Sequence, residues 1–474
     1  MCEIDLGVSS GWVLKGQGSA NVVFGYSGAD VSLVGKVLRV RKLHKSPGVQ
    51  VDNNVDQLTR EIWGTAVDVT QDVSQHFASV LSNDKHLLYG VQVQVPAQLL
   101  VSLSDQLCSG SSSSLSTSQR QLLYPAACLL PDCTLFPPSH SAFRATPDVE
   151  RQYYTSSSSA PGTAQGSAVE PVLCVEIKPK WGLLPTSPAI SAKHEVKRHK
   201  SKFQLHQKLK LAQGKITSLS AYDPLDLFST DPTRMQHALT ALFASPQNNL
   251  KLFLNGQPVQ PSDDASSLHQ VAAVVQQALK PCLHPSDTTK AVELLASLLQ
   301  EVLSTTGVLQ KLVSIQALDE HDIAGVSPLY GHVVQQLESS STIDAEPSPS
   351  AAENMHTSAL QPHDTYIQQL LDLGWSQQMK ILQNYLLATT AKDCSVMIAL
   401  QTVQQANLQH VLEGSDTQLH DNGSPWQTVR SPTLMSTRFK LTVVDLDRKH
   451  HAKIVAHHRL DQELMFHANQ GRDY

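Results

Sequence analysis

The chain has 474 residues, 41% of them hydrophobic and 16% charged, and a formal net charge of -6, which suits a globular protein long enough for a large core and two lobes. Its seven cysteines are odd in number and include no CxxC pair, which excludes the disulfide framework of a small secreted domain and favours reduced thiols in a cytosolic or nuclear protein. No segment reaches the roughly 20 apolar residues that cross a bilayer, and the N-terminal sequence lacks a basic region followed by an apolar one, so we expect neither a membrane helix nor a secretory signal.

Strands are predicted between residues 13 and 41, where glycine and β-branched residues are frequent. We expect them to be antiparallel, to be joined by short turns and to build a first lobe. The sequence GQGSAN at 16–21 lies between two of these strands. Glycines at such a turn let backbone N–H groups approach phosphates, although a turn of this kind is more often a plain hairpin. The Gly-Lys-Ser/Thr ending of a P-loop is absent, which excludes that class of nucleotide site.

Four segments are rich in serine or in other small and polar residues, namely 104–119, 155–168, 339–352 and 414–437. Such composition cannot bury enough apolar surface to offset the entropy of the chain. We therefore expect loops there and place no site residues in them.

Positive charge is concentrated at 178–210, which contains nine Lys or Arg and a single acid, Glu195. The stretch opens with EIKPK, whose Glu176, Lys178 and Lys180 share one face if the segment is extended. Residues 199–210 then predict a helix with Lys202, His206 and Lys210 on one side, where like charges repel. Three interpretations remain open on charge alone: a solvated lysine-rich face, a nucleic-acid patch, or a site for clustered phosphates.

From residue 262 onward the hydrophobic period becomes helical. Apolar residues recur from Leu268 to Leu279 at helical spacing before Pro281, and a second stripe runs from Val292 to Leu303 behind an N-cap at Ser286 or Asp287. We expect these leucines and valines to form core. Further helices are predicted at 366–373 and 377–389, and short buried strands at 395–400 and 441–444.

Polar side chains beside these strands are candidate site residues. Asn248 and Asn249 fit an ordinary turn, but paired amides also suit phosphates and ring hydroxyls. Asp393 precedes one predicted strand and Asp445 ends the other. Each carboxylate is more often a cap or turn residue, yet one could accept the proton of an attacking hydroxyl and the other could hold Mg²⁺.

Several of these motifs together resemble the inositol-pentakisphosphate 2-kinase family. They are GQGSANVVF, EIKPKWG, SKFQLHQKLK, YDPLDLFS, PQNNLKLFLNG, AKDCSVMIAL and VVDLDRK, in the order of the family. The resemblance runs from the first of these to the region of Lys453, apart from the serine-rich segments.

The resemblance implies an α+β, two-lobed fold of the inositol-phosphate-kinase type. Residues 1–170 would form a smaller ATP-binding lobe with an antiparallel sheet. Residues 171–474 would form a larger mixed α/β lobe that binds the inositol phosphate and carries the catalytic groups.

The resemblance also implies roles for individual residues. ATP would contact Gly16, Gly18, Asn21, Arg39, Glu176 and Lys178. The inositol phosphate would contact Lys180, Lys210, Asn248, Asn249, Lys251, Lys449 and Lys453. Asp393 would act as the base together with Lys178 as a catalytic cation, and Asp445 would hold Mg²⁺.

The chain departs from the family pattern at several positions: Trp181 replaces a small residue, Lys202 stands where relatives often carry Arg, Ala324 interrupts an acidic motif, and Arg448 and His450 replace leucine and proline. Plant relatives carry a structural Cys/His site after that acidic motif. Here the same region contains His332 and no cysteine, so no zinc is expected.

The resemblance therefore implies an ATP- and Mg²⁺-dependent kinase that phosphorylates the 2-hydroxyl of inositol 1,3,4,5,6-pentakisphosphate to give inositol hexakisphosphate. We expect a monomer that forms no stable nucleic-acid complex and binds no membrane. A protein kinase is excluded because HRDxxxxN, DFG and APE are absent. The alternative is an RNA- or phosphoinositide-binding protein without catalysis, which would need neither aspartate, and RNA binding would favour more than the 5% aromatic residues present.

Overall fold

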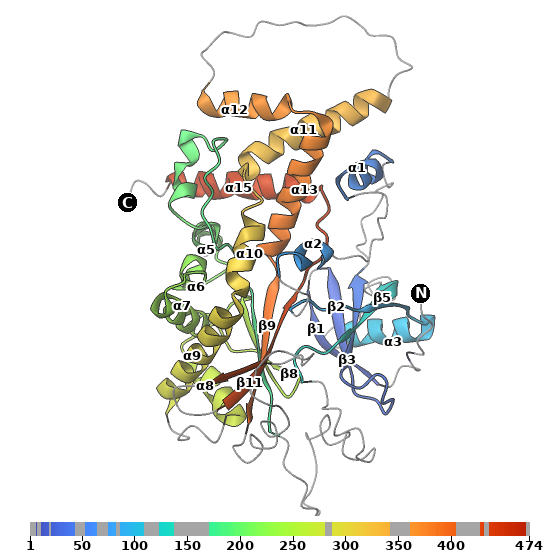
Figure 1. Ribbon diagram of the computed structural model, residues 1–474, viewed down its shortest axis with the longest axis vertical. Coiled ribbons are helices and arrows are strands. Elements are labelled where there is room, and N and C mark those ends of the chain that lie inside the picture. The colour runs from blue at the N-terminus through green and yellow to red at the C-terminus, as the bar shows by residue number, and fades with distance from the viewer. Residues whose placement is uncertain are drawn as a thin grey trace, which may run out of the picture.

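The computed structural model describes residues 6, 11–18, 20–42, 53–63, 74–81, 86–108, 123–136, 170–279, 287–341, 361–403, 427–430 and 436–470. Within them two antiparallel sheets are flanked by helices, which confirms the α+β class (Figure 1). The serine-rich segment at 155–168 lies outside the described residues, as do the greater parts of the other three low-complexity segments.

The first sheet contains the strands predicted between residues 13 and 41. Its order is β1 (Trp12–Gln17), β2 (Asn21–Tyr26), β3 (Lys36–Lys42), β5 (Leu123–Pro131) and β4 (Val91–Gln94). Alternation places Val22 and Phe24 of β2 on the buried face, where they pack with Leu38 of β3. Helix α3 (Ala97–Cys108) contributes Leu99 and Leu103 to the same core. This hydrophobic cluster fixes the hairpin that carries the glycine-rich turn.

The second sheet is larger, and its central strand carries the EIKPK motif. Its order is β10 (Gln427–Arg430), β11 (Ser436–Val444), β9 (Ser395–Val403), β6 (Leu173–Ile177), β7 (Leu250–Leu254) and β8 (Gln257–Val259). All five residues of β6 are buried. Leu173, Val175 and Ile177 face the main hydrophobic core, so Cys174 and Glu176 project from the opposite face.

Three loop expectations are wrong in part: residues 104–108 belong to helix α3, residues 339–341 to helix α11 (Asp322–Ser341), and the third is the segment at 414–437. Gln427–Arg430, inside the segment expected to be a loop, forms strand β10 and pairs with β11 through Ser436–Phe439. Composition alone did not reveal this strand, because its pairing uses backbone hydrogen bonds to a neighbour and not a run of apolar side chains.

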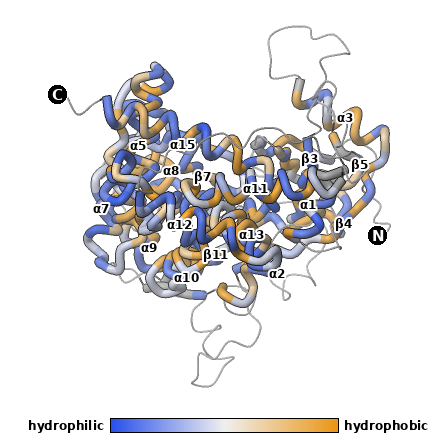
Figure 2. The backbone as a smooth tube through the Cα atoms, turned by 90° about the horizontal axis from the view of Figure 1, so that it is seen from above, coloured by the Kyte–Doolittle hydropathy of each residue, from blue (hydrophilic) through white to orange (hydrophobic). Residues whose placement is uncertain are grey.

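Helices cover the main core and extend beyond the second sheet (Figure 1). The helices that follow β6 are η3 (Ala192–Arg198, a 3₁₀ helix), α5 (Lys202–Ala212), α6 (Pro224–Leu227), α7 (Pro232–Ala244), α8 (Ser267–Ala278), α9 (Thr288–Thr306), α10 (Val308–Gln316), α11 (Asp322–Ser341), α12 (Pro362–Leu371), α13 (Trp375–Ala391) and α15 (Lys453–Gln470). Figure 2 shows α5 and α15 next to one another, and the two helices are in contact.

The structure confirms most of the helices that were predicted from hydrophobic periodicity. Asp287 is the N-cap of α9, its side chain accepting a hydrogen bond from the backbone N–H of Lys290. The helix expected from residue 199 begins instead at Lys202, because Ser201 forms a capping box with Gln204. The other boundaries differ by a few residues, as is usual at helix ends.

Two helices from the first 170 residues pack against the larger set of elements. Leu58 and Ile62 of α1 (Asn53–Trp63) join the hydrophobic cluster of α11 and α13. Phe77 of α2 (Ser74–Ala78) joins the core beneath the second sheet. The boundary near residue 170 therefore stays a prediction, since early segments contribute to both halves of the fold.

No single described helix is long and apolar enough to span a bilayer. Helices α9 and α10 pass that test of length and composition only as a pair, and they are bent by 62° relative to one another.

Candidate active site

The EIKPK motif leaves the sheet after Ile177. The N–H of Lys178 donates to the carbonyl oxygen of Asn249 at 2.8 Å. The carbonyl oxygen of Pro179 accepts a hydrogen bond from the Tyr222 hydroxyl at 2.8 Å. Lys180 has a φ of 66°, in the left-handed region. The expectation of a single extended face through Lys180 is therefore wrong, because Pro179 has no N–H to continue the ladder and the backbone turns.

This turn directs the two lysines to different carboxylates. Lys178 Nζ lies 3.3 Å from Asp445 Oδ2, at the end of β11. Lys180 Nζ lies 3.7 Å from Asp393 Oδ1, just before β9. The two predicted cations thus meet the two predicted carboxylates at neighbouring ends of β6, β9 and β11.

Asp393 forms an ion pair with Lys449 as well, at 2.9 Å, and its side chain is 54% exposed. Burial raises the pKa of Asp393, but the charges of Lys449 and Lys180 outweigh it and hold the pKa below the ordinary value. For Lys180, burial lowers the pKa more strongly than Asp393 raises it, and the charges of Lys178 and Lys210 act in the same direction as burial. Asp393 is therefore ionised at neutral pH.

Asp445 has a φ of 63°, so the chain turns sharply at the end of β11. Burial raises the pKa of Asp445, but Lys178 and Arg39 reverse that effect and leave the pKa below its ordinary value. For Lys178, the carboxylates of Asp445 and Glu176 outweigh burial and raise the pKa. This arrangement keeps one negative and one positive charge in place across the two strand ends.

The first sheet reaches the same place through Asn21 and Arg39. Asn21 Nδ2 and Arg39 Nη2 each lie 2.6 Å from Asp447 Oδ2, and Arg39 Nη2 lies 3.8 Å from Asp445 Oδ1. Two residues expected to contact ATP therefore hold Asp447, a carboxylate to which no role was assigned from the sequence. They connect the first sheet to the segment that follows β11, close to Asp445.

Glu176 lies beneath these groups and is 7% exposed. It accepts a hydrogen bond from Ser395 Oγ at 2.9 Å and pairs with Lys251 at 3.2 Å, its direct neighbour across the β6–β7 ladder. Ser395 Oγ also lies 3.3 Å from Asp445 Oδ2. Glu176 is thus mostly buried and held by Ser395 and Lys251.

Further cations surround this cluster from α5 and α15. Lys210 is close enough to lower the pKa of Lys180, and burial, followed by the charges of Lys210 and Lys202, lowers the pKa of His206 to about 4. On α15, burial and the charges of Lys202, Lys449 and Lys453 lower the pKa of His457 to about 4. The two helices therefore bring Lys202, Lys210 and Lys453 towards one region.

The two asparagines differ in their surroundings. Asn248 is exposed, whereas Asn249 is 2% exposed and its side-chain oxygen has no hydrogen-bond partner. A buried amide oxygen without a partner is costly, so this atom is a natural contact for a ligand hydroxyl or a water molecule.

The glycine-rich turn joins β1 to β2, and the backbone N–H of Gly18 donates to the Asn21 carbonyl at 2.8 Å. Neither Gly16 nor Gly18 is among the residues with positive φ. A Cβ at Gly16 would meet no atom within 4 Å, and one at Gly18 would meet only the Asn21 carbonyl oxygen at 3.8 Å. Packing does not require glycine at either position; Ser19 lies outside the described residues.

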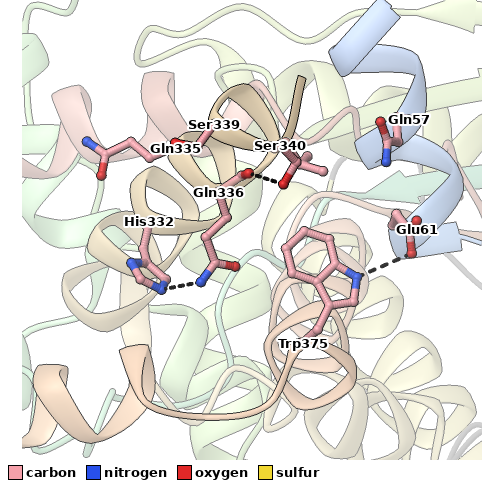
Figure 3. A pocket seen from close by; sticks show the side chains of 9 residues that line it. Gln57, Glu61, His332, Gln335, Gln336, Ser339, Ser340 and Trp375 are labelled. Carbon is pink, nitrogen blue, oxygen red and sulfur yellow. Dashed lines mark hydrogen bonds between the residues drawn. The ribbon is translucent and has the colours of Figure 1, made fainter. Parts of the chain in front are cut away.

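A cavity of about 700 Å³ lies elsewhere, between α1, α11 and α13 (Figure 3). Its lining includes Trp375, whose indole N–H donates to Glu61, and His332, whose Nε2 bonds to Gln336. None of its lining residues is Lys or Arg, and none was predicted as a site residue. Its chemistry does not suit a polyphosphate.

Neither Ser395 nor Gln316 was predicted as a site residue. The buried Gln316 side chain donates a hydrogen bond from Nε2 to the Lys180 carbonyl oxygen at 2.9 Å. A signal for Gln316 was present. It continues the buried stripe of Leu309 and Leu312 at helical spacing, and a polar residue in such a stripe needs partners.

Comparison with known proteins identifies the family of the chain. The family model described as inositol-pentakisphosphate 2-kinase matches residues 15–463. The inositol-pentakisphosphate 2-kinase of rice, Oryza sativa subsp. indica, is 28% identical, covering 97% of this chain and 93% of the rice protein. The enzyme of the same name from Arabidopsis thaliana is 28% identical over 96% of the chain and 93% of its own length, and that from Danio rerio is 25% identical over 98% and 94%. The chain therefore belongs to the inositol-pentakisphosphate 2-kinase family.

Proposed function

We propose that this protein transfers the γ-phosphoryl group of ATP to the 2-hydroxyl of inositol 1,3,4,5,6-pentakisphosphate and releases inositol hexakisphosphate. Membership of the family supports the reaction, and relatives from plants and fish carry its name. One structural observation supports the proposal most strongly. Asp393 and Asp445 stand at adjacent strand ends, each paired with its own lysine from the EIKPK motif.

The ATP phosphates are assigned to the face between the glycine-rich turn and Lys178. Gly16 and Gly18 leave the backbone open where packing does not require glycine, so phosphates can approach it closely. Arg39 and Lys178 provide positive charge below this turn. Glu176 contacts Ser395 and Lys251 and stays a predicted contact of ATP.

Asp445 is assigned to Mg²⁺. Within the described residues no group of three or more His, Cys, Asp or Glu side chains could hold a metal ion. Mg²⁺ commonly takes only one or two carboxylates and completes its shell with phosphate oxygens and water. Asp445, ionised and 42% exposed, fits that role, and Asp447 lies two residues away. When bound, Mg²⁺ would neutralise charge on the transferring phosphates.

Asp393 is assigned as the base. Its carboxylate is ionised, half exposed and held by Lys180 and Lys449. Phosphates of the substrate would compete for both lysines, which would weaken their hold on the carboxylate and raise its basicity as the hydroxyl arrives. No covalent enzyme intermediate is needed for this transfer.

The inositol phosphates are assigned to Lys180, Lys210, Lys251, Lys449, Lys453 and the two asparagines. Burial contributes most to the low pKa values of His206 and His457, and the neighbouring lysines lower both values further. Clustered anions would offset the charges of these lysines, and two highly charged ligands need such a field to approach one another.

The test is a transfer assay with labelled ATP and inositol 1,3,4,5,6-pentakisphosphate, with Asp393→Asn compared with Asp372→Asn, the same change on the exposed C-cap of α12. Wild type and Asp372→Asn should turn over, and Asp393→Asn should lose about 10²–10⁴-fold in kcat. Full activity of Asp393→Asn would refute its role. Tight binding without transfer by the wild type would favour the polyanion-binding alternative.

A further inference from the structure

Gln316 is the last residue of α10, and its side chain is completely buried. Its amide makes three hydrogen bonds to backbone groups. The carbonyl oxygen Oε1 accepts from the Gly182 N–H at 2.8 Å, and Nε2 donates to the carbonyl oxygens of Lys180 at 2.9 Å and Ala391 at 3.3 Å. One side chain therefore bridges two backbone segments that come from different parts of the chain.

Both segments carry residues of the candidate active site. Lys180 and Gly182 belong to the turn after β6, where Lys180 adopts the left-handed φ of 66°. Ala391 is the last residue of α13, two positions before Asp393. Figure 1 shows α10 beside α13, with α13 leading towards β9. The amide thus fixes the separation of the backbone at Lys180 from the backbone that presents Asp393.

The chemistry of these bonds requires an amide. The site has one N–H to satisfy and two carbonyl oxygens, so the side chain must accept once and donate twice. A carboxylate could accept but not donate, and methionine could do neither effectively. The left-handed backbone conformation at Lys180 is unfavourable for a residue other than glycine. It therefore persists only where the surrounding structure holds it in place.

The Trp181 side chain joins the same two segments independently. The ammonium groups of Lys202 and Lys392 each lie 4.6 Å from its ring centroid. Lys392 directly precedes Asp393 and is anchored by Asp319 at 2.6 Å. Contacts at Lys180 and at Trp181 therefore lead to the residues just before Asp393.

We propose that Gln316 is a positioning residue for phosphoryl transfer, holding the Lys180 turn and the Asp393 segment at the spacing that the reaction requires. The inference rests on the proposed function, since it assumes that Lys180 and Asp393 act on one substrate. It adds a residue that contacts neither ligand and acts through the backbone at both.

This positioning has an electrostatic consequence. Asp393 faces Lys449, Lys180 and Lys178, and these charges hold its pKa low against the opposing effect of burial. If the Lys180 turn moves away, part of that effect is lost and the pKa of Asp393 rises. The acidic limb of the kcat–pH profile then moves to higher pH, an effect that lower overall stability would not produce.

The experiment compares Gln316→Met and Gln316→Glu with Gln378→Met. Gln378 provides a matched control, because it is 1% exposed, lies in α13 and donates to the Leu371 carbonyl at 2.9 Å, a bond that touches no site residue. All proteins are assayed with ATP and inositol pentakisphosphate at a temperature where circular dichroism shows them folded. Gln316→Glu retains the bond from Gly182 and the shape of the side chain, so it decides the case if Gln316→Met does not fold.

Both Gln316 variants should lose about 10- to 100-fold in kcat, while the KM for ATP stays within about twofold of wild type. The acidic limb of their kcat–pH profiles should move to higher pH. Gln378→Met should keep its kcat and its pH profile. Unchanged kcat in the Gln316 variants, or losses that only follow the unfolded fraction, would overturn the inference. A wild type that cannot phosphorylate the substrate would instead overturn the proposed function.

Discussion

Lys178 and Asp445 are 267 positions apart in the chain, yet Lys178 Nζ lies 3.3 Å from the Asp445 carboxylate. The pairing is possible because β6 and β11 both flank β9, so their ends emerge at one edge of the second sheet. Each residue stabilises the charged form of the other, as the raised pKa of Lys178 and the lowered pKa of Asp445 show. A cation and a candidate metal ligand are thus set side by side before any ligand binds.

Lys178→Met should reduce kcat by about 10²–10³-fold, the usual cost of removing a preorganised charge from a transferring group. Asp445 loses its nearest cation in this variant, so its affinity for Mg²⁺ should increase while turnover falls. Steady-state kinetics across a Mg²⁺ titration measure both effects. Lys290→Met, which changes a lysine with a 73% exposed side chain on α9, should behave as wild type. A Lys178→Met enzyme with normal kcat would remove this residue from the catalytic site.

Lys449→Met tests the electrostatics of Asp393. Lys449 is the largest of the charges that lower the pKa of Asp393, and Lys180 follows. A base with a lowered pKa is lost only as the pH falls through that low value, so removing Lys449 raises the pKa and moves the acidic limb of kcat to higher pH. The KM for inositol pentakisphosphate should also rise by about 10- to 100-fold through loss of a charge-assisted contact. An unchanged acidic limb would contradict the assignment of that limb to Asp393.

Gly16→Ala should separate stability from nucleotide binding. A Cβ there meets no protein atom within 4 Å, so the melting temperature should stay close to that of wild type, while the KM for ATP rises by about tenfold, or about 1.4 kcal/mol. Gly182→Ala is the contrasting variant, because its Cβ would lie 2.5 Å from the Phe228 ring and should cost about 1–3 kcal/mol of stability. Normal ATP kinetics in Gly16→Ala would argue against phosphate contact at this turn.

Local patterns in the sequence predicted much of the fold. The stripe from Leu268 to Leu279 and the Asp287 cap gave α8 and α9, because helical periodicity is a property of neighbouring residues. The strand β10 was missed because the polar composition of its segment does not reveal the backbone hydrogen bonds that pair Arg430 with Ser436 of β11. The turn at Lys180 was missed for a related reason, since its left-handed backbone is held by Gln316, which lies 136 positions away.

The candidate site, too, could be predicted from the sequence only in part. The residue types at Lys178, Lys180, Asp393 and Asp445 were suggestive because phosphates and Mg²⁺ require cations and carboxylates. Their partners could not be derived from spacing. The contact of Arg39 with Asp447, 408 positions away, depends on how the two sheets meet. Family resemblance assigned roles to residues, whereas only the fold shows which residues hold one another.

A buried ion triad next to the site leads to the last prediction. Lys197 Nζ contacts Asp322 and lies 3.0 Å from Asp461, and the three side chains are 6%, 6% and 4% exposed. This ion triad links η3 to α11 and α15. Burial lowers the pKa of Lys197, but the two carboxylates outweigh it and leave the pKa above the ordinary 10.5.

Lys197→Met should lower the free energy of unfolding by about 3–5 kcal/mol, because it leaves two buried carboxylates without a cation. A group with a raised pKa stabilises the fold fully below its unfolded value, and this contribution is lost as the pH rises through the folded value. The difference between wild type and Lys197→Met in urea unfolding should therefore be constant from neutral pH up to about pH 10 and shrink above it. Lys208→Met, an exposed lysine on α5, should change stability by less than about 0.5 kcal/mol. Equal stabilities of the two variants would show that the triad contributes nothing to the fold.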